Sequence, residues 1–238
     1  MPKALYGLLL GSLLLTSNFL QAQPDTLTYF PSDRVRGGAP TFYDTMQYLV
    51  YYPSSGISNH RVGTSVVAIT ITPGGGMRPV EIITSLGYGF DKIIRYAITR
   101  TRDIWLADHD VKDDIVVLIP FTFLFEKSVY YRTNEPPATV QREVRIVSGI
   151  RLNIRDDITL TTRANHHYVE KHYRRARRYL NELIRRNPYS KNLYRMRATA
   201  RYYTRDREGA CADLQRITTF LKEPAPNEAE KICLKQNR

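Results

Sequence analysis

The chain has little cysteine, little tryptophan and few acidic residues, and these shortages exclude several classes of protein. Its 238 residues include two Cys and one Trp, too few cysteines for a disulfide-rich scaffold or a zinc site with four cysteine ligands. Asp and Glu number 23 against 35 Lys and Arg, so the net charge is +12. With 42% hydrophobic residues, the composition is that of a folded chain rather than a disordered or multi-span membrane protein.

Long apolar runs are also scarce. The most apolar stretch, Ala4 to Leu15, is shorter than the ~20 residues that cross a bilayer. It follows Lys3 and leads to a small residue at Ala22, which is the pattern of a secretory signal peptide over residues 1–22, cut near Ala22–Gln23. An uncleaved membrane anchor is the alternative. We expect an exported protein, periplasmic or secreted, in an oxidising compartment where nucleic acid is not a usual partner.

After a short N-terminal segment (residues 23–36), residues 37–125 show the pattern of a small α+β domain. Apolar spacing and β-branched runs predict helices at Tyr43–Val50 and Phe90–Thr99, and strands at Val62–Thr72, Arg78–Ser85 and Asp114–Phe125. Pro73 and the three glycines after it predict a tight turn between the first two strands. Pro120 inside the last strand favours an edge strand or a bulge.

This order of elements, with Trp105 before the last strand, resembles the C-terminal domain of the TonB energy-transducer family. The resemblance is carried by YLVYYPSSGISNHRVGTSVVAITITPGGGMRPVEIITSLGYGFDKIIRYAI and by IPFTFLF. It implies two helices packed on a three-stranded antiparallel sheet. It also implies that a sheet edge pairs with an extended peptide of an envelope protein, such as an outer-membrane transporter or its periplasmic segment. The matching edge residues are Ile119, Pro120, Phe121, Thr122, Phe123, Leu124 and Phe125.

The family's energy transducers keep a membrane anchor and a long proline-rich spacer, whereas residues 23–36 are all that separates the expected signal from this domain. We therefore expect a binding module rather than an energy transducer. Residues 126–162 are polar at first and then partly alternating, which predicts a linker with one or two short strands.

Residues 163–238 are predicted to form a helical, repeat-like hairpin domain. Ala176, Leu180 and Leu183 recur 34 residues later as Ala210, Leu214 and Ile217, and this period resembles tetratricopeptide repeats. A plain helical hairpin is the alternative. Since two such units are fewer than the ~3 that stand alone, we expect them to dock against the first domain, the connector strands or a partner.

The two cysteines, Cys211 and Cys233, are predicted to form a disulfide if the chain is exported. Two buried free thiols are the alternative. No metal site is expected: His166 and Glu170 share a helical face, but His172 points elsewhere. We predict no cofactor and no enzymatic activity, because no nucleophile elbow, metalloprotease motif or thiol beside a histidine is present.

Most of the positive charge lies in one segment. Residues 163–207 hold 14 Lys and Arg against 3 Asp and Glu, which accounts for 11 of the 12 net charges. The predicted basic surface consists of Arg174, Arg175, Arg177, Arg178, Arg185 and Arg186. A solvated exterior with no ligand is the alternative.

The sequence thus predicts an exported envelope protein that acts as a protein-binding or scaffold module. The TonB-like domain would pair with an extended peptide, and the helical unit would offer a second surface to a partner. One alternative is a binder of polyanionic glycan or lipid head groups that uses the basic helical unit. A second alternative is an envelope hydrolase with an unrecognised site.

Overall fold

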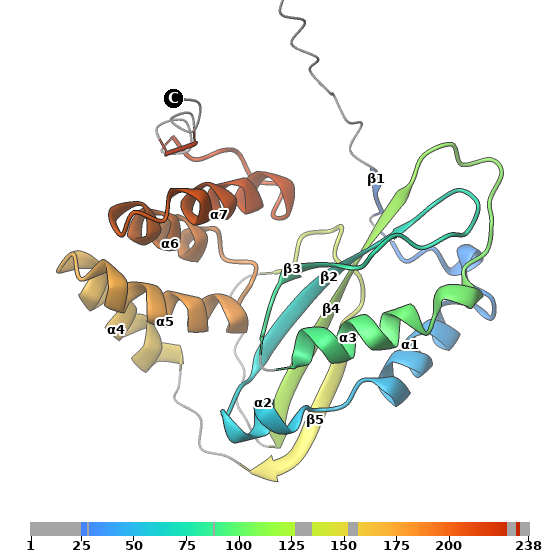
Figure 1. Cartoon of the computed structure of the whole chain (residues 1–238), viewed down its shortest axis with the longest axis horizontal. Helices are drawn as coiled ribbons and strands as arrows, with labels where there is room; N and C mark the ends of the chain where they lie inside the picture. The colour runs from blue at the N-terminus through green and yellow to red at the C-terminus, as the bar shows by residue number, and fades with distance from the viewer. Residues whose placement is uncertain are drawn as a thin grey trace, which may run out of the picture.

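A computed structural model describes residues 25–27, 29–87, 89–126, 135–151, 157–227 and 232–233 (Figure 1). The strands are β1 (Asp25–Thr26), β2 (Gly63–Ile71), β3 (Glu81–Thr84), β4 (Ile115–Glu126) and β5 (Val144–Arg151). The α-helices are α1 (Gly38–Leu49), α2 (Ser54–Ser58), α3 (Phe90–Thr99), α4 (Asp157–Val169), α5 (Tyr173–Arg186), α6 (Lys191–Tyr203) and α7 (Arg207–Thr219). Short 3-10 turns lie at Ser32–Arg34 and Arg102–Ile104. The chain therefore combines helices with one sheet, as the sequence predicts.

The sheet has the strand order β1-β4-β2-β3, with β5 also paired to β4. The central strands β3, β2 and β4 are antiparallel, whereas β1 and β5 both run parallel to β4. The turn between β2 and β3 passes through Gly75, whose φ of +79° suits glycine, and whose added Cβ would lie 2.9 Å from the backbone at Leu106 and Ala107. The predicted hairpin is present.

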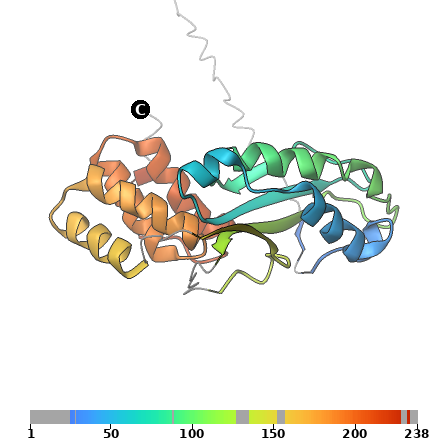
Figure 2. The same ribbon diagram turned by 90° about the horizontal axis from the view of Figure 1, so that it is seen from below.

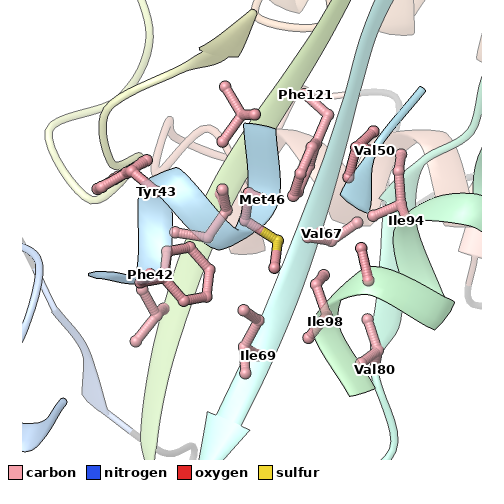
Figure 3. Close-up of a cluster of buried hydrophobic side chains, with 14 of the residues drawn as sticks. Phe42, Tyr43, Met46, Val50, Val67, Ile69, Val80, Ile94, Ile98 and Phe121 are labelled. Carbon is pink, nitrogen blue, oxygen red and sulfur yellow. The ribbon is translucent and has the colours of Figure 1, made fainter. Parts of the chain in front are cut away.

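One face of the sheet is covered by α1 and α3 (Figure 3). In α3, the apolar residues recur three and four positions apart, so that they form one stripe. This stripe meets Phe42 and Met46 of α1 and Val67 and Ile69 of β2 in a core that excludes water. Burial of each such side chain stabilises the fold by about 1.5–3 kcal/mol.

The helical unit lies beside the sheet and packs against part of its opposite face (Figures 1 and 2). Because side chains alternate along a strand, Val66 and Ala68 of β2 point away from the first core. Together with Leu118 of β4 they pack against helices α5 to α7 in a second core. The expected docking of the helical unit against the first domain is therefore present.

The prediction that Ile119 to Phe125 forms a free sheet edge is wrong. Strand β4 pairs with β2 along one side, from Ile115 to Phe123. On the other side, β5 pairs with it from Phe121 to Glu126, and β1 pairs with it at Ile115 and Val116. Strand β5 falls in the segment predicted as a linker with short strands, so its pairing partner could not be read from the sequence.

Pro120 lies in this internal strand without breaking the ladder to β2. The carbonyls of Val116 and Leu118 accept hydrogen bonds from Leu27 and Gln141, on the side away from β2. By strand alternation, Pro120 faces that same side. On that side, Leu118 is bridged to Val140, and pairing with β5 begins only at Phe121. The missing N–H of Pro120 therefore falls in the gap between these two pairings. A proline is tolerated there because no ladder hydrogen bond is lost.

Helices α4 and α5, and then α6 and α7, form two successive pairs. Ala176 and Ala210, which are 34 residues apart, are both fully buried. Of the leucines four residues after them, Leu180 is fully buried and Leu214 almost so. Cys211 in α7 is joined to Cys233, with 5.2 Å between their Cα atoms, so the predicted pair is brought to bonding distance. The signal peptide predicted over residues 1–22 lies outside the described residues.

Candidate functional site

A cleft lined mainly by polar side chains lies where the end of strand β3 meets helices α5, α6 and α7. Its cavity measures about 300 Å³, within the range of small-ligand sites, which occur preferentially at junctions between structural units. The described residues that line it are Ile83, Thr84, Ser85, Gly87, Asn181, Ile184, Arg185, Tyr194, Arg197, Arg201 and Arg216. Four of these are arginines and none is acidic. We call this the arginine cleft.

The helical unit brings the four arginines together from three helices. Arg197 and Arg201 are four residues apart on α6 and therefore share one face. That face is turned toward α7, which contributes Arg216, while Arg185 comes from the last turn of α5. Asn181 of α5 accepts a hydrogen bond from Arg197 Nη1 at 3.0 Å. The guanidinium groups are thus fixed by the helix pairing.

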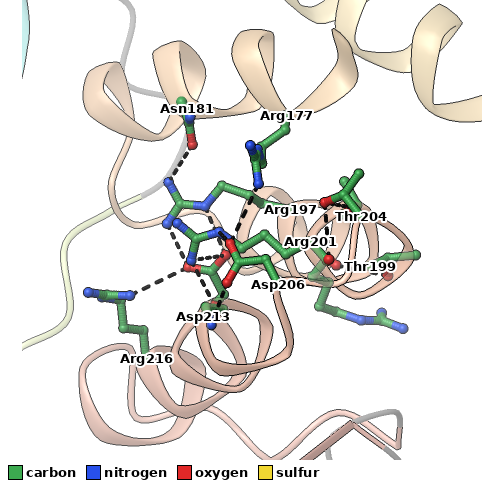
Figure 4. A network of polar contacts seen from close by, with 12 residues as sticks. Arg177, Asn181, Arg197, Thr199, Arg201, Thr204, Asp206, Asp213 and Arg216 are labelled. Carbon is green, nitrogen blue, oxygen red and sulfur yellow. Dashed lines mark hydrogen bonds and ion pairs between the residues drawn. The ribbon is translucent and has the colours of Figure 1, made fainter. Parts of the chain in front are cut away.

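One carboxylate holds three of these guanidinium groups in place (Figure 4). Asp213 of α7 is fully buried, and Arg197 donates to both of its oxygens, at 2.9 and 2.6 Å. Arg201 Nη1 lies 3.0 Å from Asp213 Oδ2, and Arg216 Nη1 lies 3.4 Å from Oδ1. A carboxylate accepts bidentate arginine bonds readily, and these are among the stronger hydrogen bonds in proteins.

Asp213 neutralises only part of this positive charge. The second nearby acid, Asp206, caps α7 by accepting from the backbone N–H of Gly209 at 3.0 Å. It also lies 3.5 Å from Arg201 Nε and from Arg177 Nη1, so its charge is shared with an arginine outside the cleft. Burial lowers the pKa of Arg201, since its cation is removed from water. The cleft therefore carries an excess of partly buried positive charge.

Such an arrangement is suited to binding an anion. Partly buried cations that outnumber their counter-ions gain from an added negative group, because water screens them poorly. Guanidinium groups in particular match phosphate and carboxylate, since their planar forks donate two parallel hydrogen bonds. Tyr194 adds an aromatic wall: Arg197 lies over its ring, 5.6 Å from the centroid.

The comparisons with known proteins add no assignment. Neither a family model, nor a curated protein, nor a solved structure matches this chain.

The residues predicted for peptide binding lie elsewhere, in β4. Ile119, Phe121, Phe123 and Phe125 are core side chains, and Thr122 is buried, with its hydroxyl 2.8 Å from that of Thr64 in β2. Leu124 is half-buried, and Pro120 belongs to the paired strand. These side chains stabilise the sheet, and none of them lines the arginine cleft.

The predicted basic surface is only partly a surface. Arg174, Arg175 and Arg178 are exposed on α5, and Arg177 is half-exposed beside Asp206. The prediction is wrong for Arg186, which is 6% exposed. Its Nε lies 3.5 Å from Glu182, which Arg185 and Arg61 also contact. Because Arg61 precedes β2, this cluster ties α5 to the first domain.

The sequence analysis missed Arg197, Arg201 and Arg216, which carry the site together with Arg185. A usable signal was present in the spacing of Arg197 and Arg201, four residues apart on one helical face. Their counter-ion, Asp213, lies 12 residues beyond Arg201 in the next helix, and only the helix pairing brings it within reach.

Two further expectations concern metals and membranes. Within the described part of the chain, no group of three His, Cys, Asp or Glu side chains is placed to hold a metal ion. His166 and His172 both neighbour His167, whose ring stacks on Tyr179. A search of the described helices finds none with the length and hydropathy needed to span a bilayer.

Proposed function

We propose that this chain is an exported binding protein that holds an anionic group of its ligand, a phosphate or a carboxylate, in the arginine cleft. The observation that carries the proposal is that three guanidinium groups, from Arg197, Arg201 and Arg216, share one buried carboxylate. The sequence predicts, as an alternative function, a binder of polyanionic glycan or lipid head groups. The present proposal assigns the binding of anions to a defined cleft. Among the described lining residues there is no histidine, so binding is favoured over acid–base catalysis.

The family resemblances remain part of the proposal. The order α1, β2, β3, α3 and β4, with both helices on one face of three antiparallel strands, supports a TonB-like first domain. Two successive helical pairs, with small buried residues 34 positions apart, support a tetratricopeptide-like unit. In this view the envelope protein uses its TonB-like domain as a platform and its helical unit to complete the cleft.

A direct test is calorimetric titration of the mature protein with inorganic phosphate and with acetate, at constant ionic strength set with chloride. We expect phosphate or acetate to bind more tightly than chloride. Arg216→Gln removes one guanidinium and leaves Asp213 paired with Arg197. Because a hydrogen bond to a charged group contributes about 1.5–3 kcal/mol, this variant should weaken binding about tenfold or more.

Arg178→Gln is the matched control. It removes the same charge from an exposed position of α5 that does not line the cleft. It should leave the affinity unchanged within about twofold, because exposed charges at a distance are screened by salt. Equal weakening by both variants, or no preference for phosphate and acetate over chloride, would show that the cleft is not the binding site.

A second candidate function is recognition of an extended protein segment by β-sheet pairing. It is supported by β5, which adds to β4 in parallel and places an eight-residue strand beside it. In this proposal the partner pairs with β5, whose Val147 side chain is 55% exposed, and not with Ile119–Phe125. A partner captured from envelope extract should then stay bound at about 0.3 M salt, since backbone pairing is less sensitive to screening. It should also bind Arg216→Gln as well as the unaltered protein.

A further inference from the structure

A second cavity of about 400 Å³ adjoins the arginine cleft, between the sheet and α7. Its floor is formed by Ala68 and Leu118 of the sheet, and Phe220, just past α7, closes one side. The rest of the lining is mixed: partly exposed Ile82, Ile83 and Val116 contribute apolar surface, and Glu81, Gln215, Arg216 and Thr219 contribute about as much polar surface. We call this the apolar groove.

The two cavities meet at Ile83 and Arg216, which line both of them. Arg216 Nε donates to the backbone carbonyl of Ile83 at 3.2 Å, while its Nη1 lies 3.4 Å from Asp213. Its guanidinium therefore lies at the boundary between the charged cleft and the groove. A ligand whose anionic end contacts Arg216 has its remaining part beside the apolar groove.

The charges in the cleft select the anionic end. With Arg177 included, four arginines contribute four positive charges, and Asp206 and Asp213 contribute two negative charges, which leaves an excess of two. A phosphate monoester carries about −1.5 to −2 at pH 7, and three of its oxygens accept hydrogen bonds. It matches this excess better than a carboxylate does, since a carboxylate brings a single charge.

We propose that the arginine cleft and the apolar groove together bind one ligand, a phosphate monoester with a single hydrocarbon chain. The phosphate contacts Arg197, Arg201 and Arg216, and the chain lies in the groove between β3 and α7. This inference rests on the proposed function and names the class of its ligand. The phosphate is inferred from charge complementarity with the arginines, and the hydrocarbon chain is inferred from the apolar groove that adjoins Arg216.

The test is a calorimetric series of n-alkyl phosphates with two to ten carbons, each below its micelle concentration, titrated into the mature protein. Each buried methylene contributes about 0.8 kcal/mol, so the affinity should rise up to about fourfold per methylene until the groove is filled. Alkyl carboxylates of equal chain length should bind at least tenfold more weakly than the phosphates.

Two variants separate the head from the tail. Ala212→Phe places a large side chain in the groove, which Ala212 lines without lining the arginine cleft. It should abolish the dependence on chain length and leave the affinity for ethyl phosphate unchanged. Ala212→Ser is the matched control and should keep the chain-length dependence. Arg216→Gln should weaken the binding of every phosphate in the series.

Several results would overturn the inference and still leave the proposed function standing. One is binding of inorganic phosphate and ethyl phosphate with no gain from longer chains. A second is equal affinity for phosphates and carboxylates of one chain length. A third is tighter binding of a peptide with an apolar C-terminal residue, through its terminal carboxylate, than of decyl phosphate. If neither phosphate nor acetate binds, the proposed function fails together with the inference.

Discussion

Replacement of Asp213 by Asn tests the electrostatic account of the arginine cleft most directly. The substitution keeps the shape of the side chain and removes the one negative charge that contacts three guanidinium groups. Since Asp213 is fully buried, no water replaces the lost charge. Among the acids in the described part of the chain, Asp206 alone then still contacts one of these three arginines, Arg201, and its side chain already caps α7.

The expected cost follows from the burial of the partners. Removal of one partner of a fully buried ion pair costs about 3–5 kcal/mol. The arginine side chains here are 12%, 21% and 33% exposed, which lets water compensate part of the loss. We therefore expect a loss near the lower end, about 3 kcal/mol. For a protein of this size, that corresponds to a fall in Tm of about 6–12 °C.

Urea unfolding, followed by the fluorescence of buried Trp105, measures this loss. Phosphate supplies the second half of the test: it should raise the Tm of Asp213→Asn more than that of the unaltered protein, because an anion replaces the missing carboxylate. Glu223→Gln is the control, since its pair with Lys191 is half-exposed and should contribute less than about 1 kcal/mol. An Asp213→Asn variant as stable as the parent protein would refute the reasoning. So would a variant whose Tm rises less with phosphate than the Tm of the parent protein does.

Three other predictions concern stability. Gly63→Ala should cost about 3 kcal/mol in the free energy of unfolding, because φ is +139° and the new Cβ would lie 2.8 Å from a carbonyl carbon in the last turn of α5; Gly74→Ala, with nothing within 4 Å, should be nearly neutral. Reduction of the Cys211–Cys233 bond, which spans 22 residues, should lower stability by about 3 kcal/mol, and thiol titration should find two thiols only after reductant. Burial raises the pKa of Tyr43 to about 12, so between pH 10 and 12 only the unfolded chain loses this proton, and stability should fall by up to about 1.4 kcal/mol per pH unit; Tyr43→Phe should make the fall of Tm with pH shallower, and an unchanged slope would contradict the assignment.

Local pattern was enough to predict the two longer helices and the three antiparallel strands of the first domain. The helix expected at Phe90–Thr99 and the strand expected at Val62–Thr72 lie within one residue of α3 and β2, because a 3.6-residue stripe and a β-branched run are visible in the sequence itself. Helix α1 begins five residues earlier than expected, at Gly38. Its first turn, which includes a proline, lacks the apolar spacing of the rest.

The pairing of distant segments could not be predicted. Strand β5 lies within the segment predicted as a linker with short strands, and nothing local to Val144–Arg151 specifies β4 as its neighbour. The arginine cleft likewise depends on segments that are distant in the sequence and adjacent in the fold. Its four arginines come from α5, α6 and α7, whereas the basic surface predicted from the sequence consists of arginines of α5 alone, because these lie close together along the chain. The density of charged residues along the sequence does not indicate which charged side chains come together in the folded structure.

Strand β2 has a consequence for how the molecule unfolds. Alternate residues of this one strand belong to different cores, Val67 and Ile69 to the first and Val66 and Ala68 to the second. Loss of α1 and α3, or loss of the helical unit, would expose apolar side chains of β2, and β2 also contributes to the core that remains. The sheet, α1, α3 and the helical unit should therefore unfold in a single cooperative transition. A fragment that stops at Phe125 would keep most of the first core and yet expose Val66, Ala68 and Leu118, which the helical unit buries, and should therefore lose stability.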